Sequence, residues 1–101
     1  MVKRMGISFL AIKMKCANPD NYTGNIMSNI ARRQLGIMRS FVKAFGSLEH
    51  IFIVVGEKEG EIAIARKFVK SVRDNLENDA SFVKPPTIEL ATEEGFRRRI
   101  L

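Results

Sequence analysis

Ile51-Phe52-Ile53-Val54-Val55 is an unbroken apolar run in which every residue is β-branched or aromatic. This pattern predicts a strand that is buried in the sheet. A second run, Gly6–Lys15 (GISFLAIKMK), has apolar residues at both parities and predicts another central strand, covered on at least one face. A third, Thr87–Ala91 (TIELA), follows Pro85-Pro86 and predicts an edge strand, because proline cannot donate to a central ladder.

The stretches between these strands have the periodicity of helices. In residues 25–45 the apolar side chains fall within one broad arc: Ile26, Met27, Ile30, Ile37, Met38, Phe41, Val42 and Phe45. Gly46 is a natural stop for this helix. A second helix is predicted over Glu61–Asn78, and Glu93–Leu101 is predicted to be a charged tail or a short last strand. Asn18 with Pro19, or Thr23 or Asn25 further on, are the candidate starts of the first helix.

The order β-α-β-α-β, with a fourth strand as an option, predicts an α/β fold, specifically an α+β two-layer sandwich. We expect a small three- to four-stranded sheet with two helices packed on one face, and parallel strands where a helix connects neighbours. The chain of 101 residues suits a single domain, 1–101, with short basic N-terminal and C-terminal tails. No apolar run is long enough for a membrane span, and we expect no signal peptide. The single cysteine, Cys16, excludes an internal disulfide and favours a reducing cytoplasm.

Positive charge is concentrated in the first half of the chain. The formal net charge is +6, and residues 51–101 carry equal numbers of acids and bases, so the whole excess lies before them. On the first predicted helix Arg32, Arg39 and Lys43 share one face, opposite the apolar arc, and Arg33 lies on its flank. No acid occurs between Asp20 and Glu49. On the second helix the pairs Lys70–Asp74 and Arg73–Glu77 are expected to neutralise each other at i,i+4 spacing.

A row of cations without acidic neighbours matches the repeating charge of nucleic-acid phosphates. The sequence therefore predicts a non-catalytic RNA- or DNA-binding protein that contacts the phosphate backbone. Gly36 would allow close approach, and the amide of Asn29 could donate to a phosphate. Only Tyr22 and Phe96 are expected outside the core, which argues against base stacking. The predicted contact residues are Arg32, Arg33, Arg39, Lys43, Arg97, Arg98 and Arg99, with Lys3 and Arg4 in support.

The alternative is a structural or regulatory homo-oligomeric module, with a dimer favoured. In that case the cations of the first helix meet an acidic partner, or Glu57, Glu59 and Glu61 of a second copy. Catalysis has little support: Cys16 and His50 fall at opposite ends of parallel strands, beyond hydrogen-bond reach. The loop 55–61 matches no nucleotide-binding or metal-binding pattern, and no cofactor or metal is predicted.

One stretch resembles a known layout. His50–Val55, followed by Gly60-Glu61-Ile62-Ala63-Ile64-Ala65 and a helix ending near Asn75-Leu76, is similar to the second strand, loop and second helix of the Alba family of archaeal nucleic-acid-binding proteins. The C-terminal domain of bacterial translation initiation factor three is similar in the same way. The resemblance covers Glu49–Leu90 and implies a β-α-β-α-β-β layout. Because Glu57, Glu59 and Glu61 make the loop acidic, no binding lysine carries over from the Alba pattern.

Overall fold

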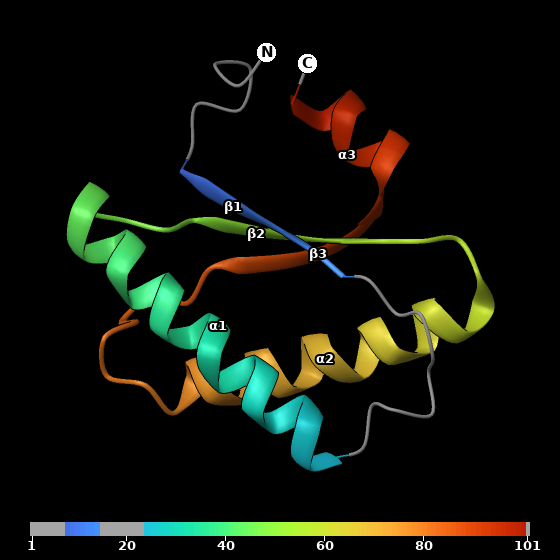
Figure 1. Ribbon diagram of the computed structural model, residues 1–101. Coiled ribbons are helices and arrows are strands. Elements are labelled where there is room, and N and C mark those ends of the chain that lie inside the picture. The colour runs from blue at the N-terminus through green and yellow to red at the C-terminus, as the bar shows by residue number, and fades with distance from the viewer. Residues whose placement is uncertain (1–7, 15–23, 101) are drawn as a thin grey trace.

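The computed structural model describes residues 8–14 and 24–100, and these form an α/β domain (Figure 1). The elements in chain order are β1 (Phe9–Lys13), α1 (Gly24–Phe45), β2 (His50–Val55), α2 (Glu59–Glu77), β3 (Thr87–Thr92) and α3 (Glu93–Ile100). The fold class is thereby confirmed. The expected helix starts at Asn18 and Thr23, together with Lys3, Arg4, Cys16 and Tyr22, lie outside the described residues.

The sheet has the order β1-β2-β3, and both strand pairs are parallel. Ile53 of β2 lies in register between Ile12 of β1 and Leu90 of β3. All six residues of β2 are buried, as the unbroken apolar run predicts for a central strand. β1 and β3 are the two edge strands of the described sheet, so the expected edge position of Thr87–Ala91 is confirmed and the central position expected for Gly6–Lys15 is wrong.

The two long helices cover one face of the sheet, and α3 lies on the opposite face (Figure 1). The main core lies between the sheet and these two helices. From β2 it takes Ile51, Ile53 and Val55, while Phe68 and Leu76 of α2 are each about 1% exposed. This arrangement confirms the expected pair of helices on one face.

Residues Glu93–Ile100 form the helix α3, where we expected a charged tail or a short last strand over Glu93–Leu101. The described residues contain no fourth strand, so the expectation of one from the β-α-β-α-β-β layout is wrong for them. The hydroxyl of Thr92 accepts a hydrogen bond from the amide of Gly95 at 3.0 Å, which caps the first turn. Arg97 and Arg98 pair at i,i+4 with Glu93 and Glu94, at 3.4 Å and 2.6 Å. Acids in the first turn and arginines in the last also suit the helix dipole.

Below α3 lies a small aromatic cluster. Phe52 of β2 is fully buried, and its ring lies 5.2 Å from that of Phe96 and 5.7 Å from that of Phe9. Phe96, expected outside the core, is therefore half-buried in this cluster. The guanidinium of Arg99 lies 5.4 Å from the centre of the Phe52 ring, a cation–π contact. The second face of the sheet is thus covered by one helix through aromatic packing and ion pairs.

The buried side of α1 is rotated from the arc that the sequence predicts, by roughly 60° about the helix axis. Met27, Ala31, Leu35 and Met38 are buried, whereas Ile37 and Phe45 are 49% and 71% exposed. The reason is that α1 packs beside α2 and also shares the core cluster with residues of β2, so its buried side faces between two neighbours. Periodicity alone identifies apolar positions and cannot choose which of them a second helix will cover.

Candidate nucleic-acid interface

The outward side of α1 carries three cations that meet no carboxylate. Arg32, Arg33 and Lys43 are exposed, and within residues 8–14 and 24–100 none of them forms an ion pair. These cations have no acidic partner on their own helix, because none of the 22 residues of α1 is acidic. Gly36 lies between them along the helix, and a Cβ atom placed there would meet nothing within 4 Å. The surface between these cations is therefore open.

The fourth predicted cation of α1 is differently placed. Arg39 donates from Nε to Oδ2 of Asp79 at 2.7 Å, which ties α1 to the turn after α2. Asp79 also accepts the backbone amide of Ser81 at 2.8 Å. The Ser81 amide, followed by the Arg39 guanidinium, holds the pKa of Asp79 below its usual 3.8. The rotation of α1 turns Arg39 toward α2, so this cation is already partly neutralised.

Four further cations lie on α2, and none of them is among the contact residues that the sequence predicts. Arg66, Lys67, Lys70 and Arg73 are all exposed. The expected pairs Lys70–Asp74 and Arg73–Glu77 are wrong, since the described part of the chain contains neither ion pair. A signal for this was present, because no acid occurs between Glu61 and Asp74. α1 and α2 pack side by side, so their cations belong to one outer layer (Figure 1).

The C-terminal arginines lie on the other side of the sheet, on α3, and each has a carboxylate partner. Arg97 pairs with Glu93 and Arg98 with Glu94, as described above, while Nη1 of Arg99 donates to both carboxylate oxygens of Glu89, at 2.6 Å and 2.7 Å. Glu93 also pairs with Lys13 at 3.1 Å. Lys13, and to a lesser extent Arg97, lower the pKa of Glu93. The structure therefore does not bring Arg97, Arg98 and Arg99 together with the cations of α1.

His50 is the one histidine of the chain, and it belongs to the α3 side of the sheet. Its ring lies 4.4 Å from that of Phe52, tilted by 31°. Its Nε2 lies 3.2 Å from Oε1 of Glu89, the carboxylate that also receives Arg99. His50 is 8% exposed, so it acts as a buried link between two strands and α3. Cys16, the other residue considered for catalysis, lies outside the described residues.

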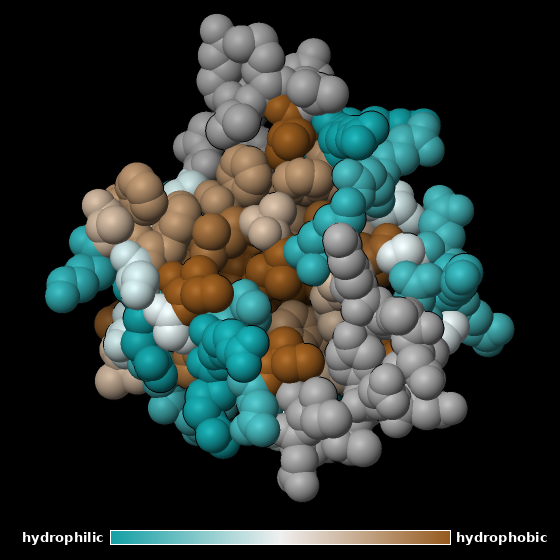
Figure 2. All heavy atoms as spheres, in the orientation of Figure 1, coloured by the Kyte–Doolittle hydropathy of each residue, from teal (hydrophilic) through white to brown (hydrophobic). Residues whose placement is uncertain are grey.

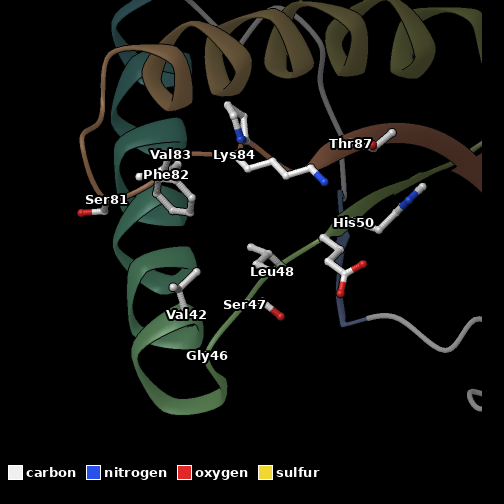
Figure 3. Close-up of a pocket in the computed structure, with 12 residues that line it drawn as sticks. Val42, Gly46, Ser47, Leu48, His50, Ser81, Phe82, Val83, Lys84 and Thr87 are labelled. Carbon is white, nitrogen blue, oxygen red and sulfur yellow. The ribbon is translucent and has the colours of Figure 1, made fainter.

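A hollow of about 670 Å³ opens at the N-terminal ends of β2 and β3 (Figure 3). Leu48 and Phe82 form its inner wall, and Lys84 extends across it. Backbone amides around the hollow form hydrogen bonds within the protein. The amide of Thr87 donates to the carbonyl of Glu49, and the amides of Glu49 and His50 both donate to the carbonyl of Ser8. Its remaining lining residues are Val42, Gly46, Ser47, Glu49, His50, Ser81, Val83, Pro85 and Thr87.

The hollow has polar groups but no arrangement that activates a nucleophile within the described residues. The hydroxyl of Ser47 shares a hydrogen bond of 3.1 Å with that of Ser8, not with a base. The ring of His50 points away from Leu48 and Phe82 (Figure 3). Ligands of parallel α/β sheets usually bind beyond the carboxyl ends of the strands, and this hollow lies at the opposite ends. Across the same residues no group of three or more histidine, cysteine or acidic side chains is arranged to hold a metal ion.

Comparison of the chain with protein-family models, with curated proteins and with solved structures gives no match. The resemblance to the Alba layout thus has no support from a match of sequence or structure. No helix in the described part of the chain has both the length and the apolar character to cross a membrane. Function is therefore inferred from the charge and geometry of the residues themselves.

Proposed function

We propose that the protein is a non-catalytic nucleic-acid-binding protein that contacts the phosphate backbone with the outer layer formed by α1 and α2. One observation carries the proposal: the seven exposed cations of this layer, apart from Arg39, meet no carboxylate within the described residues. They are Arg32, Arg33 and Lys43 on α1, and Arg66, Lys67, Lys70 and Arg73 on α2. When cations that are not already paired within the protein neutralise phosphates, the counterions condensed on the nucleic acid are released, and this release favours binding.

The spacing suits a run of phosphates. Arg32 and Lys43 lie eleven residues apart in α1, which is about 16 Å along the axis at 1.5 Å per residue. The arginines can make two-pronged contacts to phosphate oxygens, and Gly36 leaves room between them. Phe45, the exposed aromatic side chain of α1, lies on the opposite side of the helix from Arg32 and Lys43, and Phe68 of α2 is buried. We therefore expect binding with little dependence on base sequence, to RNA or DNA, within the reducing cytoplasm that a single cysteine favours.

The test measures binding of the intact chain to mixed-sequence duplex DNA and to a structured RNA by fluorescence anisotropy, over a range of salt concentrations. Several phosphate contacts predict an affinity that falls steeply with salt, with a slope of about 0.9 per phosphate contacted on a double-logarithmic plot. Arg32→Ala with Lys43→Ala should lower both the affinity and this slope. A matched control, Arg97→Ala with Arg98→Ala, removes cations already paired with Glu93 and Glu94 and should change binding far less.

The proposal is wrong if the intact chain binds neither probe at about 50 mM salt, where phosphate contacts are strongest. An equal loss from the α1 and α3 variants would show instead that only net charge matters. The alternative, a homo-oligomeric module without nucleic acid, predicts a clean preparation whose ultraviolet spectrum lacks a nucleic-acid peak. That spectrum is a sensitive check, because the chain has no tryptophan and one tyrosine.

A further inference from the structure

α1 carries two stripes that contain no charged residue, and the described residues cover the first fully and the second only in part, since Ile30 and Phe41 of the second also pack against the core. The first, Met27, Ala31, Leu35 and Met38, is buried against α2 and the sheet. The second lies about 100° further round the helix. It consists of Ile30, Gln34, Ile37, Phe41 and Ala44. Ile37 at its centre is 49% exposed, Ala44 is exposed, and the other three are half-buried.

The second stripe has the spacing of a helix-packing seam. Its members recur at alternating intervals of four and three residues, which places them on one line along the helix, as in a coiled coil. The line contains no charged residue. In Figure 2, which shows the molecule from the side where α1 and β1 lie nearest the viewer, apolar side chains gather in the middle of the face with charged groups around them. A helix of a soluble protein normally leaves its second side polar, so this stripe is unusual.

We propose that this stripe is the interface for a second copy of the same chain, with two α1 helices packed antiparallel about a two-fold axis that passes next to Ile37. The proposal does not rest on nucleic-acid binding. An antiparallel pair centred on Ile37 is complementary in size, because the large Ile30 lies opposite the small Ala44 of the second copy. A two-fold axis uses the same stripe twice, so one stripe on each chain is sufficient.

Charge supports the same arrangement. Arg33 borders the stripe, and α1 has no acid to neutralise a second Arg33. In the antiparallel pair each Arg33 lies opposite Phe41 of the second copy, not opposite its own counterpart. An arginine over an aromatic ring is an attractive contact. A parallel pair would place the two Arg33 side chains together, along with every other cation of α1, and is disfavoured.

The size of the stripe sets the strength of the dimer. From Ile30 to Ala44 the stripe is about 21 Å long at 1.5 Å per residue and about 10 Å wide, so it offers roughly 210 Å² of contact per copy, against about 800 Å² in a typical stable interface. The dimer should therefore be weak and should form only at high protein concentration. Because both helices are cationic and the contact is apolar, added salt should strengthen the dimer by screening the repulsion.

Sedimentation velocity of the intact chain tests the proposal, from about 10 µM to about 1 mM protein and at about 50 mM and 500 mM salt. The mass should rise with concentration from 11.4 kDa toward twice that value, and should rise further at the higher salt. Ile37→Glu should keep the chain monomeric. The matched control is Val83→Glu, which places the same charge at an apolar residue that is 96% exposed elsewhere, and it should leave the dimer intact. Circular dichroism checks that both variants are folded.

A covalent trap gives a second, independent readout. In a Cys16→Ser background, Ile37→Cys places two thiols next to the two-fold axis, so mild oxidation should join two chains quickly, whereas Val83→Cys should do so slowly. The proposal is overturned if the chain stays monomeric at the highest concentration and at both salts, or if both cysteine variants cross-link equally. It is also overturned if salt dissolves the dimer, which would indicate contacts between the cations and Glu57, Glu59 or Glu61. None of these results bears on nucleic-acid binding, which is measured separately.

Discussion

Arg39 and Asp79 join the middle of α1 to the turn that follows α2, with Nε of the guanidinium 2.7 Å from Oδ2 of the carboxylate. This ion pair takes one cation out of the basic layer and at the same time holds the two helices side by side. The stability of the helix pair and the charge of the basic layer therefore both depend on this ion pair. Replacing Asp79 changes both, and the two effects can be measured separately.

Asp79→Asn should lower stability and raise nucleic-acid affinity together. Loss of the carboxylate removes the pair that holds α1 against the turn after α2, so the thermal unfolding midpoint should fall. The same change frees Arg39 for a phosphate, so binding should tighten, and its salt dependence should steepen by about one phosphate contact. Calorimetry and anisotropy measure the two effects. If affinity is unchanged while stability falls, Arg39 is a structural residue only.

The acid stability of the fold should depend on the same carboxyl group. Its pKa is lowered in the folded chain, by the Ser81 amide and then by Arg39, so it binds its proton more weakly folded than unfolded. The contribution is complete above the usual pKa of 3.8 and is lost as the pH falls through the lower, folded value. The difference in stability between the native chain and Asp79→Asn should therefore be constant near neutral pH and shrink below about pH 4. Urea unfolding at a series of pH values tests this, and a difference that grows toward acid would contradict it.

The main core should be intolerant of truncation at Phe68. Its side chain is 1% exposed and lies in α2 facing the sheet, so Phe68→Ala leaves a cavity and should cost about 3–5 kcal/mol. For a domain of this size, such a loss is a large part of the total stability. Val83→Ala, at a residue that is 96% exposed, serves as the control and should change stability by less than about 0.5 kcal/mol. Urea denaturation gives both values, and comparable losses would place Phe68 outside the core.

Two neighbouring arginines of α3 should differ in their effect on stability. Arg98 pairs only with Glu94 on the same exposed helix, and Arg98→Ala should cost less than about 0.5 kcal/mol. Arg99 binds both oxygens of Glu89 on β3 and lies over the ring of Phe52, so Arg99→Ala removes a link between α3 and the sheet. We expect a loss of about 1 kcal/mol, because both the ion pair with Glu89 and the cation–π contact with Phe52 are lost. Hydrogen exchange of the α3 amides should also accelerate in Arg99→Ala and not in Arg98→Ala.

Much of the fold could be predicted because its signals are local. The run at residues 51–55 predicts a buried strand whatever its neighbours are, and the pair Pro85-Pro86 predicts where β3 begins. The third helix could also have been predicted from Thr92, the two glutamates, Arg97 and Arg98, since the cap and both i,i+4 ion pairs lie within seven residues. Those charges suggested a solvated tail because α3 contributes no fully buried residue.

The candidate site was harder to predict because the acid that neutralises a given cation can be far from it in the sequence. Arg39 meets Asp79 forty residues away, and Arg99 meets Glu89 across the start of α3, so neither partner can be identified from helical spacing. The opposite error occurred on α2, where i,i+4 spacing predicted two ion pairs that the structure does not contain. Spacing places two charges within reach of each other, while the packing of the whole domain decides which pairs form. Whether the remaining cations bind nucleic acid stays a prediction.

The central position of β2 has a consequence for how the chain is made. A ribosome releases β1, α1 and β2 before it has synthesised α2 and β3, so the nascent chain for a time presents its most apolar segment with one edge bare. Short β-branched segments of this kind associate readily between chains. The vulnerable period ends only when Thr92 has emerged and the last strand has closed the open side. Slow translation between residues 56 and 92 should therefore lower the yield of folded protein, while slow translation after residue 92 should not.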